Sequence, residues 1–292
     1  MKGIIFVNPF GEPKESIYQA ERLKEEFDLL GVSASIDGRG YLKNSVKDGK
    51  ITADFDCDFA IYLDKDKYFS ACLEKNGIKL FNSHSAIRTC DDKGETYIAL
   101  SDCGVNMPYT VFAPVCYFNE LKNDLNAIRE IGETLSYPVI VKESYGSKGK
   151  GVYKADNEKE LIDISEKLKT RPHLYQRYIG YRTGTDIRAI VIGGKFVCAM
   201  LRENKNDFRS NIALGGKGKA IIPPESFIKT AEKCAKILNL DYCGVDLLFD
   251  KNDEPCVCEV NSNAFIGEIE KVTGVNVAKK YAEYIFKKIR KN

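Results

Sequence analysis

The chain has 292 residues, of which 43% are hydrophobic and 11% aromatic, so it carries enough apolar material for sizeable cores. Its 44 Lys and Arg residues against 42 Asp and Glu residues leave a net charge of +2, without the broad basic footprint of proteins that bind nucleic acid or membrane surfaces. No stretch of the sequence approaches the ~20 apolar residues that cross a bilayer. We therefore expect a folded protein that acts on a small molecule or peptide, with no nucleic-acid partner and no membrane contact.

The ten cysteines are dispersed through apolar segments. This distribution favours reduced thiols, mostly in the core of a cytoplasmic protein, over a secreted disulfide framework. Cys256 and Cys258 form a C-x-C pair, and His84 and His173 add no zinc-ligand spacing, so we predict no zinc site. The first residues hold a short apolar run that meets polar residues at once, which is typical of a first strand and unlike a signal peptide.

Strand and helix patterns alternate over residues 1–88. The predicted strands are residues 3–7, 32–36, 59–63 and 78–81, and the predicted helices are residues 17–30 and 68–75. Such alternation predicts a parallel sheet with crossover helices. The segment holds no G-x-G-x-x-G, since Gly38-Arg39-Gly40 is too short for a dinucleotide fingerprint. Either this unit contributes one wall of a site or its role is structural.

Glycine and lysine dominate the next informative stretch. It follows a helix expected over residues 91–103, a strand expected over 107–112 and a helix expected over 121–135. Residues 137–155 predict a strand with Lys142, a loop with Gly146, Gly149 and Gly151, and a return strand over 152–154. Glycine-rich backbone can approach phosphate closely. An ordinary surface hairpin is the alternative. Lys142 favours the phosphate site, because a lysine in an apolar strand needs an anionic partner.

Arginines mark the segment that follows. A helix over residues 158–169 and a strand over 173–179 precede a hairpin of strands 186–191 and 195–201, which turns at Gly193-Gly194. Arg188 and Arg202 lie on or near these strands, and Arg209 and Asn211 lie in a second glycine-rich loop. Arginine forks suit phosphate and carboxylate, although a solvated surface position would explain any one of them. Helices over residues 226–238 and 277–289 show apolar stripes that core packing explains.

Two apolar runs, residues 245–249 and 255–260, predict a β-hairpin. With a turn at Asn252-Asp253, Asp246 faces Glu259 across the ladder, and Asn261 lies on the same side of its strand as Glu259. Converging hard oxygen ligands of this kind suit Mg²⁺. A surface hairpin with scattered acids is the alternative interpretation.

These segments follow one another as in the ATP-grasp superfamily. The motifs that carry the resemblance are VIVKES with GSKGKGV, YQRYI, TDIRAIVIGG, DFRSNIALGG, GVDLLF and CEVNSNAFIGEIEKVTGVNVAKK. The chain most closely resembles the RimK-like branch, whose best-known member is an α-L-glutamate ligase, over about residues 90–290, while the first 88 residues match more loosely. The resemblance implies a small parallel-sheet α/β domain (residues 1–90) before an ATP-grasp domain (91–292). Two α+β subdomains, about 91–177 and 178–292, would clamp ATP.

The family's functional positions carry over residue by residue. Lys142 and Lys93 match the lysines on the nucleotide side, and the strand from Gln176 to Ile179 matches the hinge that faces adenine, with Arg177 in place of the usual glutamate. The implied catalytic residues are Arg188 and Arg202. The implied nucleotide contacts are Lys93, Lys142, Gly146, Ser147, Gly149, Gly151, Gln176, Arg177, Tyr178, Ile179, Asp186, Arg209, Ser210 and Asn211. The implied ligands of Mg²⁺ or Mn²⁺ are Asp246, Glu259 and Asn261, and Ser262-Asn263-Ala264-Phe265 departs from the family's usual residues.

The resemblance implies a ligase that joins a carboxylate to an amine through an acyl phosphate, releasing ADP and phosphate. The acceptor would be an amino acid, peptide or protein tail, and we expect a homo-oligomer. The alternative is a nucleotide-binding regulatory or assembly module without turnover.

Overall fold

The computed structural model describes residues 1–10, 14–120 and 122–291. Its helices are α1 Lys14–Leu29, α2 Lys67–Lys75, α3 His84–Asp91, α4 Lys93–Leu100, α5 Leu125–Leu135, α6 Glu158–Leu168, α7 Glu225–Ile237, α8 Gly267–Thr273 and α9 Val277–Arg290. Its strands are β1 Lys2–Phe6, β2 Ser33–Asp37, β3 Val46–Lys47, β4 Lys50–Ile51, β5 Phe59–Tyr62, β6 Leu80–Phe81, β7 Thr110–Phe112, β8 Val139–Glu143, β9 Val152–Ala155, β10 His173–Arg177, β11 Thr185–Ile192, β12 Lys195–Glu203, β13 Lys217–Ile221, β14 Tyr242–Phe249 and β15 Pro255–Asn261. Short 3₁₀ turns lie at Gly40–Lys43 and Ile212–Leu214.

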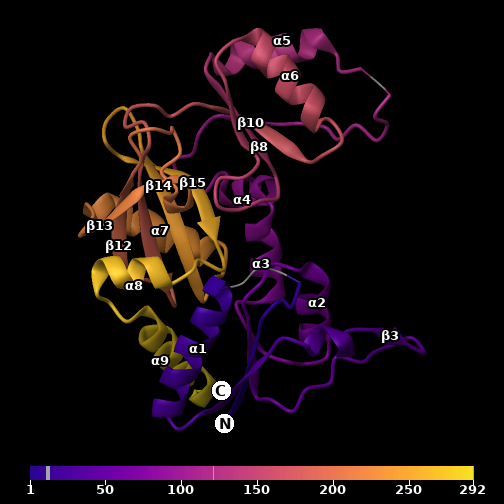
Figure 1. Cartoon of the computed structure of the whole chain (residues 1–292), viewed down its shortest axis with the longest axis vertical. Helices are drawn as coiled ribbons and strands as arrows, with labels where there is room; N and C mark the ends of the chain where they lie inside the picture. Colours follow the sequence, from indigo (N-terminus) through magenta and orange to yellow (C-terminus); the bar gives the residue numbers. More distant parts are fainter. Residues whose placement is uncertain (11–13, 121, 292) are drawn as a thin grey trace.

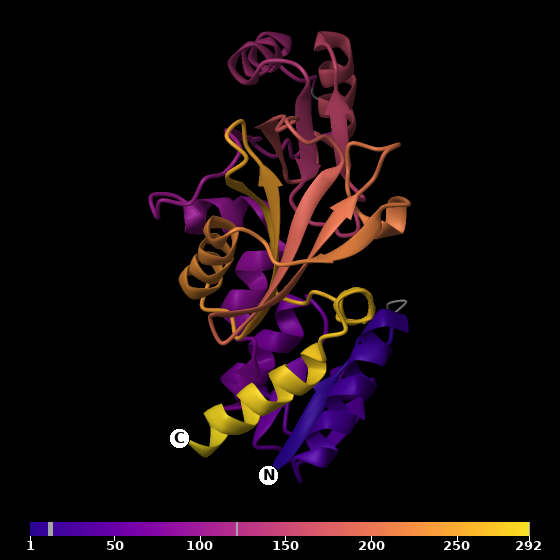
Figure 2. The same cartoon turned by 90° about the vertical axis from the view of Figure 1, so that its left-hand side faces the viewer.

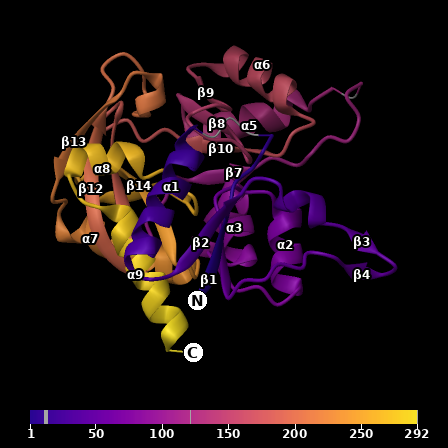
Figure 3. The ribbon, with the colours of Figure 1, turned by 60° about the horizontal axis from the view of Figure 1, so that its bottom comes forward.

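The first sheet has the order β2-β1-β5-β6, and its paired strands run parallel. This confirms the parallel sheet predicted from the strand and helix alternation. Helices α2 and α3 pack on one face through Phe69, Leu73 and Ile87. On the other face α1 packs beside the C-terminal helix α9 (Figures 1 and 3). The first sheet is therefore covered by both the beginning and the end of the chain.

The sheet β7-β10-β8-β9 forms a separate lobe with antiparallel pairing (Figure 1). Helices α5 and α6 cover one face through an apolar core that includes Ile128, Leu135 and Leu161. The uncovered face turns toward the third sheet. The predicted helix over residues 121–135 begins in the structure at Leu125, capped by Asp124; its predicted first residue lies outside the described residues.

The third sheet, β13-β12-β11-β14-β15, is antiparallel and stands between the other two (Figure 2). Helix α7 packs on one face in a core with α3 and α4, while α8 and α9 take up the lower part of the opposite face. The upper part of that opposite face is left to form a cleft with β8 and β10. The hairpin β11–β12 turns at Gly193-Gly194 as predicted. The division of the chain into domains at about residue 90 remains a prediction.

Helix α3 was not expected, because the sequence pattern placed the first helix of this region at residue 91. The Ser83 side chain caps it by accepting a hydrogen bond from the backbone N–H of Ala86. A second cap, Asp92, then starts α4 at once. Two short helices with separate caps therefore replace the single predicted one, and the break puts Lys93 on the first turn of α4.

Asn82 joins the first sheet to the third. Its Nδ2 donates to the carbonyl oxygens of Tyr242 and Ser262 (2.7 and 2.9 Å), and its Oδ1 accepts from the backbone N–H groups of Asp241 and Tyr242 (2.6 and 3.0 Å). The residue is 3% exposed. All four hydrogen-bonding positions of the amide are filled by backbone. One side chain thus fixes the end of β6 to the start of β14 and the end of β15.

Within the part of the chain that the structure describes, no helix is long and apolar enough to cross a membrane.

Candidate active site

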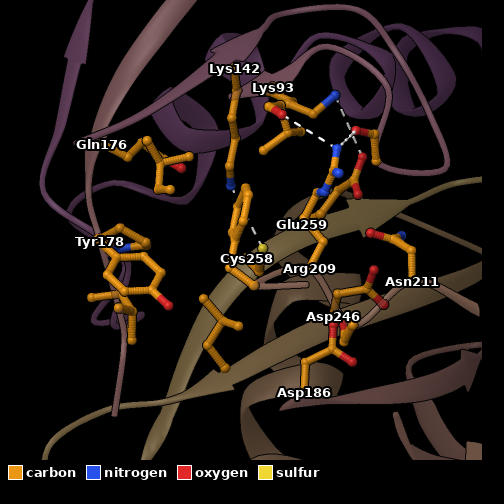
Figure 4. A pocket seen from close by; sticks show the side chains of 18 of the residues that line it. Lys93, Lys142, Gln176, Tyr178, Asp186, Arg209, Asn211, Asp246, Cys258 and Glu259 are labelled. Carbon is orange, nitrogen blue, oxygen red and sulfur yellow. Dashed lines mark hydrogen bonds and ion pairs between the residues drawn. The ribbon is translucent and has the colours of Figure 1, made fainter. Parts of the chain in front are cut away.

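A cavity lies between the sheet that holds β8 and β10 and the sheet that holds β14 and β15 (Figure 4). Lys142 reaches down from β8, whereas Cys258, Glu259 and Asp246 come from the hairpin below it. The structure brings most of the predicted site residues to its walls. They are Lys93, Lys142, Gly146, Ser147, Gly149, Gln176, Arg177, Tyr178, Ile179, Asp186, Arg202, Arg209, Ser210, Asn211, Asp246 and Glu259. We call this cavity the interlobe cleft.

The hairpin β14–β15 confirms the predicted pairing of Asp246 with Glu259. The predicted turn at Asn252-Asp253 is wrong, because Phe249 pairs with Pro255 and five residues connect the strands. A β-bulge beside Asp246 offsets this difference. Asp246 pairs with Glu259 and Leu247 with Val257, so Cys258 is the extra residue. The bulge turns Cys258 as well as Glu259 into the cleft, where the Sγ of Cys258 accepts a hydrogen bond from Lys142 Nζ at 3.6 Å.

Cys258 is the lining residue that the sequence analysis missed. The cysteines were expected to be mostly core, and strict alternation along β15 gave no sign that residues 258 and 259 share a face. The burial of the residues on either side of Cys258 and Glu259 indicates the irregularity. Val257 and Val260 are 1% and 0% exposed and belong to the same core, although residues three apart on a regular strand face opposite sides. Two buried valines at that spacing indicate a bulge.

Lys93 begins α4 and is 7% exposed. Its Nζ donates to the carbonyl oxygen of Gly146 at 3.1 Å and lies 3.7 Å from Glu259 Oε1. Burial lowers the pKa of Lys93, and the nearby Lys65 and Lys142 lower it further, while Glu259 opposes these effects. A bound anion would offset the cost of burying this ammonium charge. Lys93 and Lys142 together therefore give the cleft a strong preference for anions.

Two arginines, the buried Arg202 and the partly exposed Arg188, hold the two aspartates of the cleft. Arg202 binds Asp186 through two hydrogen bonds, one of them at 2.7 Å from Nε, and its Nη2 also lies 3.0 Å from Asp246 Oδ2. Arg188 binds Asp246 with both ends of its fork, at 2.8 and 2.7 Å. Burial alone would raise the pKa of Asp246, but the two arginines hold it down at about 2. Asp186, predicted to lie beside the ribose, thus has Arg202 as its partner in this structure.

The predicted glycine loop closes over the cleft. Gly149 has a φ of +76°, and a Cβ there would lie 2.8 Å from Leu214 and 3.0 Å from Asn211. Its carbonyl accepts a hydrogen bond from Arg209 at 2.9 Å. Gly151 does not line the cleft among the described residues; it packs behind the loop against Glu143. In this structure its carbonyl accepts a hydrogen bond from the Glu143 N–H (2.8 Å) where the hairpin returns, and its contact with nucleotide remains a prediction.

The end of β10 and the segment that follows it line the cleft. Gln176, Arg177, Tyr178 and Ile179 all line it. The Arg177 side chain turns away and donates to the carbonyl oxygens of Leu135 and Thr134 at the end of α5, at 3.2 and 3.1 Å. The arginine that stands in place of the family's glutamate therefore caps a helix, and only its backbone remains available to a ligand.

A second, larger cavity adjoins the cleft. Its volume is about 940 Å³ against about 110 Å³ for the cleft. Its walls come from α1, the segment after β5, the glycine loop, β11, β12 and the segment from Asn261 to α8. Two predicted site residues, Arg188 and Asn261, line this cavity instead of the cleft. Ser147, Arg202, Asn211 and Glu259 line both.

The donor set of the predicted metal site fits Mg²⁺. Glu259 stands where the two cavities meet and Asn261 lines the second cavity, so a carboxylate and an amide oxygen could serve as hard ligands. The buried Nδ2 of Asn261 has no hydrogen-bond partner among the described residues, but as a donor it cannot bind a cation. Asp246 uses about three of its four lone-pair sites on arginines. Over the described ranges, no group of three His, Cys, Asp or Glu side chains could hold a metal ion. A metal would therefore need further oxygen ligands from water or phosphate.

The fold of the chain is similar to that of solved structures. D-alanine–D-alanine ligase from Bacillus anthracis superposes with a TM-score of 0.75 at 18% identity, covering 100% of this chain and 98% of that one. This likeness concerns the fold, which the chain also shares with solved ATP-grasp ligases. The chain belongs to the RimK-like ATP-grasp family, because the model of the RimK-like ATP-grasp domain matches residues 91–285.

Curated relatives agree with the family. Human beta-citrylglutamate synthase B is 35% identical over 214 residues, which cover 73% of this chain and 54% of that protein. The chain thus spans about half the length of this relative. The probable alpha-L-glutamate ligase 2 of Pseudoalteromonas atlantica is 32% identical over 293 residues, which cover 95% of this chain and 94% of that protein.

Proposed function

We propose that this protein is an ATP- and magnesium-dependent ligase that joins a carboxylate to an amine and releases ADP and phosphate. The observation that carries the proposal is the meeting of two cavities at Glu259 and Arg202. One cavity is narrow, lies between two sheets and carries buried lysines; the other is larger and has charged side chains of both signs on its walls. This arrangement suits transfer of a phosphoryl group from a nucleotide in the first cavity to a carboxylate in the second.

Each wall of the cleft has a role in this proposal. The backbone from Gln176 to Ile179 and the apolar Leu248 and Ile140 would enclose the adenine, while Lys142 and Lys93 would neutralise phosphate charge. The backbone N–H groups of the glycine loop would bind the phosphates. The closed loop would also exclude water from them. Arg209 holds this loop through the carbonyl of Gly149.

The carboxylate substrate would lie at the junction of the cavities, where Arg202 and Arg188 face it. Its oxygen attacks the γ-phosphorus, ADP leaves, and an amine then displaces phosphate from the acyl carbon. Mg²⁺, held by Asp246, Glu259 and Asn261, would supply charge stabilisation at the β and γ phosphates. The attacking amine must be neutral, so turnover should rise with pH until the amine is deprotonated.

The names of the relatives point to an amino acid, glutamate in the first instance, as the amine. We further propose a cytoplasmic homo-oligomer that acts on a small molecule, peptide or protein carboxylate. The free cysteines among the described residues are compatible with a reducing compartment.

The test is the fate of labelled ATP and of a labelled carboxylate. The protein is incubated with ATP, Mg²⁺, an amino acid and a carboxylic acid, each taken from a panel. The carboxyl oxygens of the acid under test carry ¹⁸O. We expect ADP and phosphate, with one ¹⁸O carried into the phosphate. Pyrophosphate and AMP would overturn the mechanism, and tight nucleotide binding without cleavage across the panel would favour the regulatory module instead.

Glu259→Gln provides the matched variant for this assay, because it keeps the size of the side chain and removes its charge. We expect at least a hundredfold loss of kcat, as for removal of a charge-stabilising group in an active site. The control is Glu254→Gln in the connection of the same hairpin, where the side chain is exposed and lies outside both cavities.

A further inference from the structure

We propose that Tyr97 is a positioning residue that holds the β15 bulge and so keeps Cys258 and Glu259 side by side in the interlobe cleft. The role of Glu259 in catalysis rests on the proposed function. The geometry of the bulge does not depend on it.

Tyr97 lies one helical turn after Lys93 on α4 and is 5% exposed. Its Oη donates toward two consecutive carbonyl oxygens of β15, that of Cys258 at 2.9 Å and that of Val257 at 3.3 Å. These carbonyls belong to the bulge itself. A single buried hydroxyl thus contacts the backbone at the point where the strand departs from regular alternation.

The bulge needs such a partner because β15 is the last strand of its sheet. On its outer edge β15 has no neighbouring strand among the described residues, and that edge is met by Tyr97 and by the carbonyl of Asn106, which accepts from Val257 N–H at 2.8 Å. An extra residue leaves backbone groups without ladder partners. Asn106 holds the N–H of Val257, and Tyr97 holds the carbonyls of Val257 and of the extra residue Cys258.

Loss of this hold has a defined structural consequence. Val257 and Val260 both face the core only because two residues between them face the cleft. If the strand returned to strict alternation, either Cys258 or Glu259 would turn into that core. A thiol is far less costly to bury than a carboxylate. We therefore expect Cys258 to leave the cleft first and the backbone beneath Glu259 to shift with it.

Tyr97→Phe tests the proposal, because it keeps the ring in its packed position and removes only the hydroxyl. The control is Tyr281→Phe, which removes an equally buried hydroxyl that donates to the carbonyl of Phe81 at 3.0 Å, away from the cleft. Circular dichroism checks that both variants fold. The first readout is labelling of Cys258 by a small alkylating reagent with and without ADP, resolved from Cys256 by peptide mass spectrometry.

In the wild type we expect ADP to protect Cys258, since the sulfur lies in the cleft beside Lys142. In Tyr97→Phe the part of the Cys258 labelling that ADP prevents should fall several-fold. Tyr281→Phe should be labelled like the wild type. The second readout is binding of Mn²⁺ to the ADP complex by electron paramagnetic resonance, which we expect to weaken by about tenfold, as is usual when an outer support of a metal site is removed.

Unchanged Cys258 labelling and Mn²⁺ binding in Tyr97→Phe would overturn the proposal. Neither readout depends on turnover. A wild-type protein that shows no ligase activity with any substrate pair would refute the proposed function, yet the labelling result would still decide the role of Tyr97. Where turnover is found, Tyr97→Phe should lower kcat by about tenfold or more and raise the Mg²⁺ concentration for half-maximal rate.

Discussion

Asn82→Ala should destabilise the protein more than any surface substitution. The change removes four hydrogen bonds to backbone groups of Asp241, Tyr242 and Ser262 that are otherwise enclosed between two sheets. At a net value of about 1 kcal/mol for each hydrogen bond, the loss is about 4 kcal/mol. That is a large part of the ~5–15 kcal/mol by which folded proteins are stable.

Urea unfolding followed by circular dichroism measures this loss. The control is Asn76→Ala, which removes a single side-chain hydrogen bond to the carbonyl of Ala53 within the first unit and should cost about 1 kcal/mol. Asn82→Asp separates hydrogen bonding from volume, because an isosteric carboxylate turns an oxygen toward the carbonyls of Tyr242 and Ser262. It should destabilise at least as much as Asn82→Ala. An Asn82→Ala protein within about 1 kcal/mol of the wild type would refute the reasoning.

Further predictions concern charge, capping and the glycine loop. The pKa of Asp246 falls from 3.8 to about 2 on folding, so its ionic contacts contribute on the order of 2 kcal/mol to stability above pH 4. This contribution is lost as the pH falls toward 2. Asp246→Asn should therefore flatten the acid limb of a stability–pH curve, and an unchanged limb would contradict this. Arg177→Ala should lower stability by about 1 kcal/mol through loss of the α5 cap but change the KM for ATP less than about twofold, measured by urea unfolding and initial rates. Gly149→Ala should raise the KM for ATP by about tenfold or more, because its Cβ would meet Leu214 and Asn211. Gly194→Ala, with a similar φ of +74° and open space around its Cβ, serves as control and should leave the KM unchanged.

Sequence patterns predicted the elements whose signals are local. The parallel sheet of the first unit followed from the alternation of apolar runs with amphipathic helices, and the β11–β12 hairpin from its glycine pair. The facing pair Asp246 and Glu259 was also correct, although the turn was not, because the bulge at Cys258 restores the register that the longer connection would have shifted. Bulges have no composition signal of their own and emerge from tertiary contacts such as that of Tyr97.

Side-chain destinations were harder to predict than positions along the chain. Arg177 was expected at the site and its backbone is there, but the open carbonyls at the end of α5 offer its guanidinium a better partner than the cleft does. Arg188 and Asn261 lie in the second cavity because neighbouring residues on a sheet can face different spaces along its length. Whether Lys142, Glu259 and the others bind nucleotide and metal stays a prediction for the experiments above.

The packing of α9 against α1 has a consequence for synthesis of the chain. Ile5, Leu23 and Phe59 of the first unit share one core with Tyr281 and Ile285 of the last helix. On the ribosome, which delivers residues in order at about 5–20 per second, the first sheet would emerge many seconds before the helix that covers it. Its apolar face would remain open throughout that interval. A nascent chain stalled before residue 270 should therefore recruit chaperones, and a chain from which residues 277–290 have emerged should not.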